Sequence, residues 1–210
     1  MKFLCEFFPE LMNDVTSITR NGELVYGSVK TQNQLELTLD DKVMAQITHK
    51  GSFSEKNYQR LAPVFALHSH RARIFLKWLK EVKALAPDQL NWIGFYFTAT
   101  FLFNEASTDL IVGPYFGEWT HHQRIPLNKG ICGMAVREDQ TINIEDVSQN
   151  PEYLSCSVKT KSELVIPLKN SQGITIGELD IDSHELAAFS PELTAKIEEK
   201  CLDFKDLINE

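Results

Sequence analysis

Hydrophobic and polar residues alternate along much of the first fifty residues, a period of two that is typical of β-strands. Apolar side chains occupy every second position over residues 35–39 and again over residues 43–47, on either side of Asp40-Asp41. This pattern predicts a hairpin. Asn21-Gly22 gives a second tight-turn signal between two further strand-like runs. We therefore expect residues 1–53 to form a β-rich N-terminal extension.

Near Ser54 the spacing of apolar residues changes from strand-like alternation to a helical repeat. Apolar residues recur at helical spacing from Pro63, which suits the first turn of a helix, until Pro87 closes the segment. A short helix is expected near Gly130, and Ser190 is a good N-cap for a closing helix with one apolar stripe.

Strand-like runs lie between these helices. They fall at residues 91–103, 110–116, 141–144, 163–168 and 174–181. The order of the elements predicts an α+β fold in which helices flank a central, mostly antiparallel β-sheet. We assign residues 54–210 to this single domain.

The composition narrows the class of protein. The chain has 210 residues, 43% of them hydrophobic, which is enough for a full core. A net charge of −8 without a long basic run argues against nucleic acid as a partner. The longest strongly apolar stretch, 93–103, is too short to cross a bilayer, and the N-terminus shows no clear secretory cleavage site. We expect a cytoplasmic protein, away from membranes, whose four scattered cysteines are free thiols.

Several motifs in the second part of the chain occur in an order known from one family. They are Asn91-Trp92-Ile93-Gly94-Phe95-Tyr96, Gly113-Pro114-Tyr115, Arg124-Ile125-Pro126, Lys129-Gly130-Ile131-Cys132-Gly133, Ser162-Glu163-Leu164-Val165-Ile166-Pro167-Leu168 and Leu179-Asp180-Ile181-Asp182-Ser183. In this order they resemble the GAF domains of the free methionine-(R)-sulfoxide reductase type. The resemblance runs from about Ser54 to the C-terminus. It implies a GAF-like fold and a homodimer.

The resemblance implies thiol chemistry at Cys156, which matches the family's nucleophile. Its thiolate would attack the sulfur of free methionine-(R)-sulfoxide, methionine would leave, and the cysteine would become a sulfenic acid. Glu163, Asp180 and Asp182 match the family's acidic pocket. Because crowded carboxylates repel one another, at least one should hold a proton near neutral pH and could donate it to the departing oxygen.

The substrate side chain and ammonium group have candidate partners as well. Trp92 and Tyr96 match the family's aromatic walls for the methyl end of the substrate, and their spacing along a strand puts them on one face. Asp180 and Asp182 share a face of another strand, and together with Glu163 they suit the substrate's ammonium group. Two acids on a strand otherwise fit for burial are costly unless they have partners or a function.

One departure from the family pattern concerns the resolving thiol. The family usually carries a third cysteine just before Arg124, where this chain has His122. An imidazole cannot form a disulfide, so the resolving residue could be Cys132, although its apolar neighbours also suit a packing thiol, or else Cys5 or Cys201 brought close by the fold. Otherwise thioredoxin or another external thiol would reduce the sulfenic acid.

Two further readings follow from the residues. The chain could be a non-catalytic GAF sensor or small-ligand-binding module that has lost the resolving cysteine. A metal site could be built from His68 and His70 or from His121 and His122, but His68 and His70 point roughly 200° apart on a helix. We therefore expect no metal and no bound cofactor.

Overall fold

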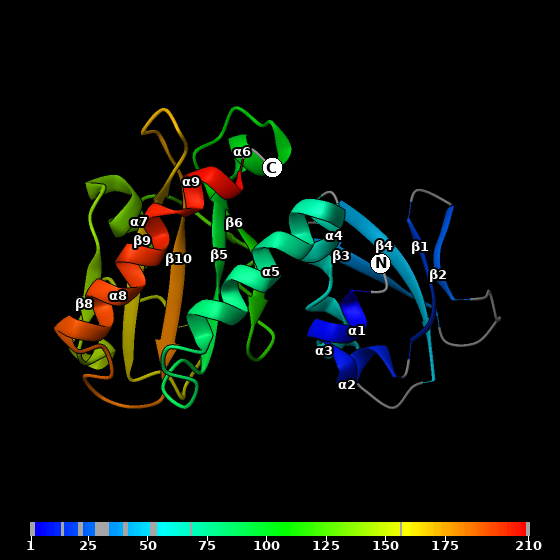
Figure 1. The fold of residues 1–210 in the computed structure, drawn as a ribbon, viewed down its shortest axis with the longest axis horizontal. Helices are drawn as coiled ribbons and strands as arrows, with labels where there is room; N and C mark the ends of the chain where they lie inside the picture. Colours follow the sequence, from blue (N-terminus) through cyan, green and yellow to red (C-terminus); the bar gives the residue numbers. More distant parts are fainter. Residues whose placement is uncertain are drawn as a thin grey trace.

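Two antiparallel sheets organise the chain, with helices between them and around them (Figure 1). The chain is described by a computed structural model. The residues described are 3–13, 15–20, 23–27, 34–39, 42–50, 54–67, 69–155 and 157–208.

The smaller sheet is built from the N-terminal residues and has the strand order β2-β1-β4-β3. Its strands are β1 (Val15–Arg20), β2 (Glu23–Gly27), β3 (Gln34–Leu39) and β4 (Lys42–His49). The predicted hairpin is confirmed, since β3 and β4 pair antiparallel with Leu37 opposite Ala45. The turn residues Asp40-Asp41 and Asn21-Gly22 lie outside the described residues.

The alternation within this hairpin is interrupted. The register of the β3–β4 pair shifts between Leu37 and Thr38, so that Thr38 lies opposite Val43. A register shift of this kind moves the following side chains to the other face of the sheet. Val43 is accordingly 52% exposed, whereas Ala45 and Ile47 are buried.

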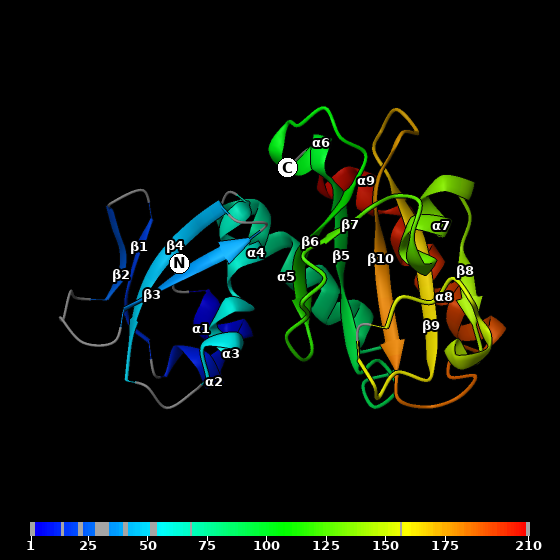
Figure 2. The same cartoon turned by 180° about the vertical axis from the view of Figure 1, so that it is seen from behind.

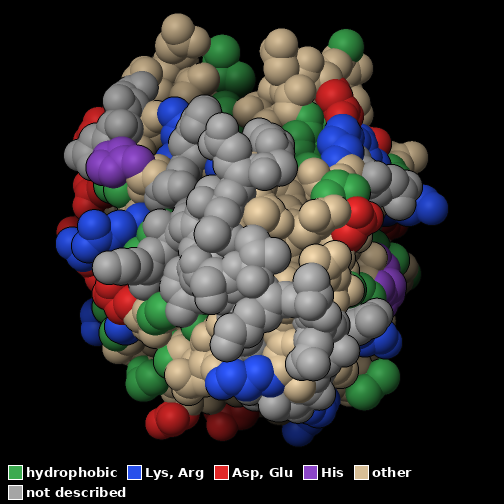
Figure 3. Space-filling model, turned by 90° about the vertical axis from the view of Figure 1, so that its right-hand side faces the viewer, with side chains coloured by type: hydrophobic (Ala, Val, Ile, Leu, Met, Phe, Trp, Pro, Cys, Tyr) green, Lys and Arg blue, Asp and Glu red, His purple; other side chains and the backbone are tan. Residues whose placement is uncertain are grey.

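Figure 3 views the molecule from the side on which the smaller sheet lies. Around the margin of this view, Lys, Arg, Asp and Glu side chains are scattered, and the described atoms show no extended hydrophobic patch.

The larger sheet has the strand order β7-β6-β5-β10-β9-β8, and every neighbouring pair is antiparallel. Its strands are β5 (Trp92–Thr98), β6 (Leu110–Phe116), β7 (Arg124–Ile125), β8 (Ile142–Ile144), β9 (Ser162–Lys169) and β10 (Thr175–Ser183). The predicted α+β class, with a central antiparallel sheet, is confirmed.

Helices cover both faces of this sheet. Three of them, α5 (Ser69–Lys83), α8 (Pro191–Leu202) and α9 (Phe204–Leu207), lie on the face seen in Figure 1. On the opposite face, α7 (Gly130–Glu138) packs across β9 and β10 (Figure 2). The sheet is therefore enclosed near its centre, where β10 lies between β5 and β9.

The remaining helices are short. They are α1 (Leu4–Phe7), α2 (Pro9–Met12), α3 (Glu55–Gln59), α4 (Ala62–Ala66), α6 (Ala99–Phe103) and a 3₁₀ turn, η1 (Val147–Gln149).

The prediction of one helix from Pro63 to Pro87 was wrong. The chain forms α4 and α5 instead, because Leu67 adopts an extended backbone conformation (φ −100°, ψ 159°) that ends α4. Helical periodicity continues across this break in the sequence, so the apolar pattern alone did not reveal it.

The predicted strand over 91–103 is also shorter than expected. β5 ends at Thr98, whose side-chain oxygen accepts a hydrogen bond from the backbone N–H of Phe101 and caps α6. A threonine in this role turns an apolar run from strand into helix. The N-cap prediction at Ser190 is confirmed, since its hydroxyl accepts from the N–H of Leu193.

The two sheets are joined by shared packing. Helix α4 contacts β3 and β4 of the smaller sheet and β6 of the larger one. The ring of Phe116 in β6 lies 6.4 Å from that of Phe7 and 5.8 Å from that of Phe8, measured between centroids. The domain boundary between residues 53 and 54 stays a prediction.

Among the described residues, no helix combines the length and apolar character of a membrane span.

The aromatic cluster between the larger sheet and its helices gives a first prediction. The fully buried ring of Phe204 lies 5.1 Å from that of Phe75 and 5.2 Å from that of Phe95. We expect Phe204→Ala to lower the free energy of unfolding by about 3–5 kcal/mol, because it leaves a cavity in the core. Urea denaturation measures this loss. The matched variant Leu202→Ala, at a side chain 70% exposed, should change stability by less than about 0.5 kcal/mol.

Candidate functional site

Four carboxyl groups lie on one face of the central strands. Glu178, Asp180 and Asp182 alternate along β10, and Glu163 on β9 lies directly opposite Asp182. Because residues at alternate positions of a strand share a face, all four point to the side that α7 covers. None of the four is more than 4% exposed.

Helix α7 adds a thiol to this acidic face. The helix begins at Gly130, whose φ of +72° lies in the left-handed region that favours glycine. Two residues further on, Cys132 is buried with its Sγ 4.0 Å from Oε1 of Glu163. One ligand atom each from Cys132, Glu163 and Asp180 fall within 4.8 Å of one another.

Burial changes the protonation of these acids. Loss of solvation, followed by repulsion from neighbouring carboxylates, raises the pKa values of Glu163, Glu178 and Asp180 well above their ordinary range. The pKa of Asp182 is raised by burial to about 7, with the Thr160 hydroxyl opposing the rise. Near neutral pH the site therefore holds several protons that it can donate.

Aromatic residues border the acids on the neighbouring strand. Trp92 and Tyr96 of β5 lie opposite Asp182 and Glu178, and their rings stack at 6.2 Å. Between them, Gly94 lies opposite Asp180. Trp92 is partly exposed, whereas Tyr96 is fully buried.

A small cavity opens beside Asp182. Its volume is about 80 Å³, and its lining residues are Asn91, Trp92, Glu118, Trp119, Thr120, Ser157, Thr160, Asp182 and His184. Two of these, Ser157 and Thr160, belong to the segment that follows Cys156. Cys156 itself lies outside the described residues. Its predicted role stays a prediction, as do the catalytic and binding roles of the other site residues.

Two contacts join the segment around Cys156 to the loop that carries His122. Nε2 of His122 donates a hydrogen bond to the carbonyl of Ser155, at 3.1 Å, and Nζ of Lys159 lies 2.5 Å from Oε1 of Glu118. Burial is the main cause that lowers the pKa of His122, which favours the neutral imidazole. The hydroxyl of Tyr96 donates to the carbonyl of His122 at 2.9 Å and ties this loop to the sheet.

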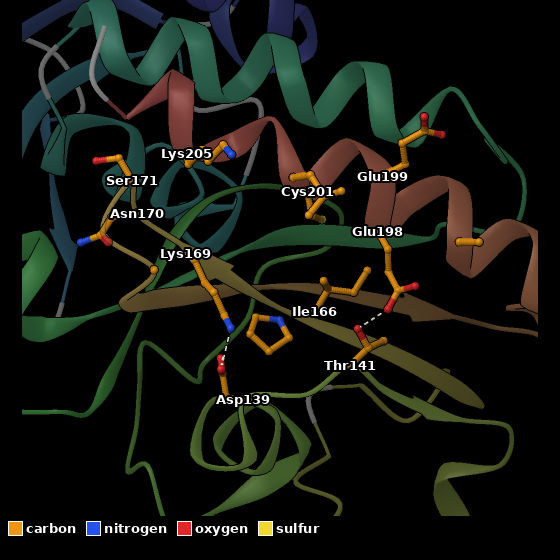
Figure 4. A pocket seen from close by; sticks show the side chains of 14 residues that line it. Asp139, Thr141, Ile166, Lys169, Asn170, Ser171, Glu198, Glu199, Cys201 and Lys205 are labelled. Carbon is orange, nitrogen blue, oxygen red and sulfur yellow. Dashed lines mark hydrogen bonds and ion pairs between the residues drawn. The ribbon is translucent and has the colours of Figure 1, made fainter.

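A much larger pocket lies elsewhere on the sheet and holds none of the predicted site residues (Figure 4). It has a volume of about 720 Å³ between β9, the turn that follows it and α8. Lys169 pairs with Asp139 at 2.5 Å in its wall. Cys201 also lines it, and burial raises the pKa of this thiol so that it stays protonated.

Glu178 is the member of the acidic face that our sequence analysis missed. It carried the same signal as its neighbours, because it precedes Asp180 by two positions on one strand. Neither of its carboxyl oxygens accepts a hydrogen bond of normal geometry from a described residue.

Comparisons with known proteins identify the family to which this fold belongs. A family model for the GAF domain matches residues 62–198. The "Free methionine-R-sulfoxide reductase" of Saccharomyces cerevisiae is 39% identical over 107 residues, which are 51% of this chain and 56% of that protein. The chain thus spans just over half the length of that curated relative.

Two solved structures share the fold. One is a type II free methionine-R-sulfoxide reductase from Thermoplasma acidophilum, with a TM-score of 0.58 and 34% identity over 67% of this chain and 92% of that one. The other is free methionine-R-sulfoxide reductase from Neisseria meningitidis in complex with its substrate, with a TM-score of 0.58 and 26% identity over 77% of this chain and 94% of that one. The predicted GAF-like architecture is confirmed.

The space above Gly94 gives a second prediction. A Cβ atom added there would lie 2.3 Å from Cβ of Tyr115 and 2.6 Å from Cη2 of Trp92. We expect Gly94→Ala to displace the Trp92 ring and to lower the free energy of unfolding by about 1–3 kcal/mol. Chemical denaturation and near-ultraviolet circular dichroism measure the two effects. Unchanged values for both would show that the ring has room to spare.

The raised pKa of Asp182 gives a third prediction. Between about pH 4 and pH 7 the folded state keeps a proton on Asp182 that the unfolded state releases, so stability falls as the pH rises through this range. We expect Asp182→Asn to match the wild type near pH 4 and to exceed it by about 2 kcal/mol or more at pH 8. Urea denaturation across this range measures the difference.

Asp139 is the matched control for this experiment. The hydrogen bond from Lys169 lowers the pKa of Asp139. Asp139→Asn should therefore lose a little stability at pH 8 instead of gaining it. A gain of the same size in both variants would contradict the assignment to Asp182.

Proposed function

Because the chain belongs to the GAF domain family, we propose that it reduces free methionine-(R)-sulfoxide to methionine with a protein thiol. One observation carries the proposal: buried, proton-holding carboxyl groups lie beside a cavity whose wall includes the residue that follows Cys156. The yeast relative and the two solved structures, which are free methionine-R-sulfoxide reductases, support it.

The reaction begins at the thiolate of Cys156. It attacks the sulfoxide sulfur and takes over the oxygen, so that the cysteine is oxidised by two electrons to a sulfenic acid while the sulfoxide is reduced to methionine. One proton must reach the oxygen as its bond to the substrate sulfur breaks. Asp182 lines the cavity and has a pKa of about 7, which suits a general acid near neutral pH.

The other residues recognise the substrate. Trp92 lines the same cavity and offers an apolar surface to the methyl end of the substrate. Glu163 lies opposite Asp182, so that either carboxyl group, once ionised, can pair with the substrate's ammonium group. Asp180 is a third carboxyl group that can pair with the ammonium group. The ring of Tyr96 stacks on that of Trp92 and holds it in place.

The cavity must widen to admit the substrate. Its volume of about 80 Å³ is well below the roughly 300–1,000 Å³ of typical ligand sites. Two surface contacts join the neighbouring loop to the segment around Cys156: an ion pair between Glu118, which lines the cavity, and Lys159, and a hydrogen bond between His122 and Ser155. Such contacts contribute about 1 kcal/mol each, so substrate binding can break them.

The sulfenic acid must then be reduced without the family's usual cysteine. We propose that thioredoxin or another external thiol supplies the two electrons and releases the oxygen as water, and that no bound cofactor takes part. Cys132 is the internal candidate for a resolving residue.

The homodimer and the cytoplasmic location stay predictions.

The fourth prediction tests the reaction. Incubated with free methionine-(R)-sulfoxide and dithiothreitol, the protein should release methionine, and Cys156→Ser should abolish this release because serine cannot form a sulfenic acid. Chromatography of the amino acids measures the product. The control Cys5→Ser, at an exposed thiol, should keep wild-type turnover.

A different outcome would favour the second reading of the chain. If the wild type binds methionine sulfoxide in calorimetry but never releases methionine, the site is a ligand-binding module. The replacement of the usual cysteine by His122 is the observation that keeps this reading open.

A further inference from the structure

The thiol and two of the carboxyl groups form a compact ligand set from three rigid elements. Cys132 lies on α7, Glu163 on β9 and Asp180 on β10, and one ligand atom from each lies within 4.8 Å of the other two. Around a tetrahedral zinc ion, with bonds of about 2.3 Å to sulfur and 2.0–2.2 Å to oxygen, two ligand atoms lie roughly 3.4–3.6 Å apart. The three side chains must therefore draw together by up to about 1.3 Å to bind one ion.

A second observation, independent of this spacing, also points to a cation. Glu178 is 0% exposed, and neither of its oxygens accepts a hydrogen bond of normal geometry from a described residue. The same holds for Oδ1 of Asp180. Glu178 precedes Asp180 by two positions on β10, so its side chain lies on the same face of the strand. Buried carboxyl oxygens without donors require a proton or a cation.

We propose that Cys132, Glu163 and Asp180, with Glu178 as a fourth ligand, bind a thiophilic divalent cation such as Zn²⁺. Four ligands from protein side chains are the usual number for this ion. The sulfur ligand favours Zn²⁺ or Co²⁺ over Mg²⁺ and Ca²⁺, which prefer oxygen alone. Binding converts the Cys132 thiol to a thiolate and releases its proton, together with carboxyl protons, to solvent.

The small cavity lies beside this site but does not open onto it. Asp182 lines the cavity and lies opposite Glu163 on the neighbouring strand, whereas none of the four ligands lines it. An ion that enters from this cavity must therefore displace the packed side chains around Asp182.

The proposed metal site does not include the neighbouring histidines. His121 and His122 have ring centroids 3.9 Å apart, but they belong to the loop above the sheet and are absent from the ligand set. Because the proposed ion occupies Glu163 and Asp180, it acts as an inhibitor of the proposed reductase and not as its cofactor.

The fifth prediction is made on the Cys156→Ser variant, so that it does not depend on turnover. Titration with Co²⁺ should show one ion per chain, a thiolate-to-cobalt charge-transfer band in the near ultraviolet, and release of protons to a pH indicator. Zn²⁺ should displace the cobalt, and millimolar Mg²⁺ should not. Adding Cys132→Ser should remove the band and weaken binding by at least about tenfold.

Further variants separate this site from others. Glu178→Gln, which keeps the shape of the side chain, should weaken binding and release fewer protons, while Cys5→Ser and the double variant His121→Ala/His122→Ala should leave the titration unchanged. Circular dichroism checks that each variant is folded. A band that persists without Cys132, or binding that is lost with the histidines, would overturn the proposal even if the protein proves to be a reductase.

Discussion

The burial of four carboxyl groups beside one thiol is the constraint on which the site depends. An ionised carboxylate without partners in such a place costs several kcal/mol, so the fold keeps these groups protonated or leaves them ready for a cation. Strand β10 brings three of the four to one face by simple alternation. The close packing of α7 then removes them from water. Their raised pKa values are a consequence of this arrangement and not of any single neighbour.

Apolar side chains on the opposite face of the same strands stabilise the fold and offset the cost of burying the acids. Leu179 and Ile181, which alternate with the acids along β10, are fully buried. They lie on the side of the aromatic cluster that includes Phe95 and Phe204, where each buried aromatic ring contributes a large apolar area. One strand thus carries both the core and the site, and a shift of its register by one residue would exchange them.

The sequence was informative wherever a short-range pattern decided the structure. The hairpin of β3 and β4, the cap at Ser190 and the shared face of Asp180 and Asp182 all follow from spacing along the chain. The break at Leu67 is a change of backbone conformation, which the periodicity of apolar residues does not encode. The contact between Cys132 and Glu163 could not be predicted from the sequence motifs either, because α7 and β9 come together only in the folded chain.

The positions of the remaining thiols favour an external reductant over an internal one. Cys201 lines the large pocket under α8, and Cys5 is exposed in the N-terminal helix α1. Cys132 is thus the one described thiol on the acidic face, and it is buried among carboxyl groups. A buried thiol has poor access for disulfide exchange, whose rate depends on that access. A small or protein thiol from solution avoids this difficulty, because it does not start from a buried position.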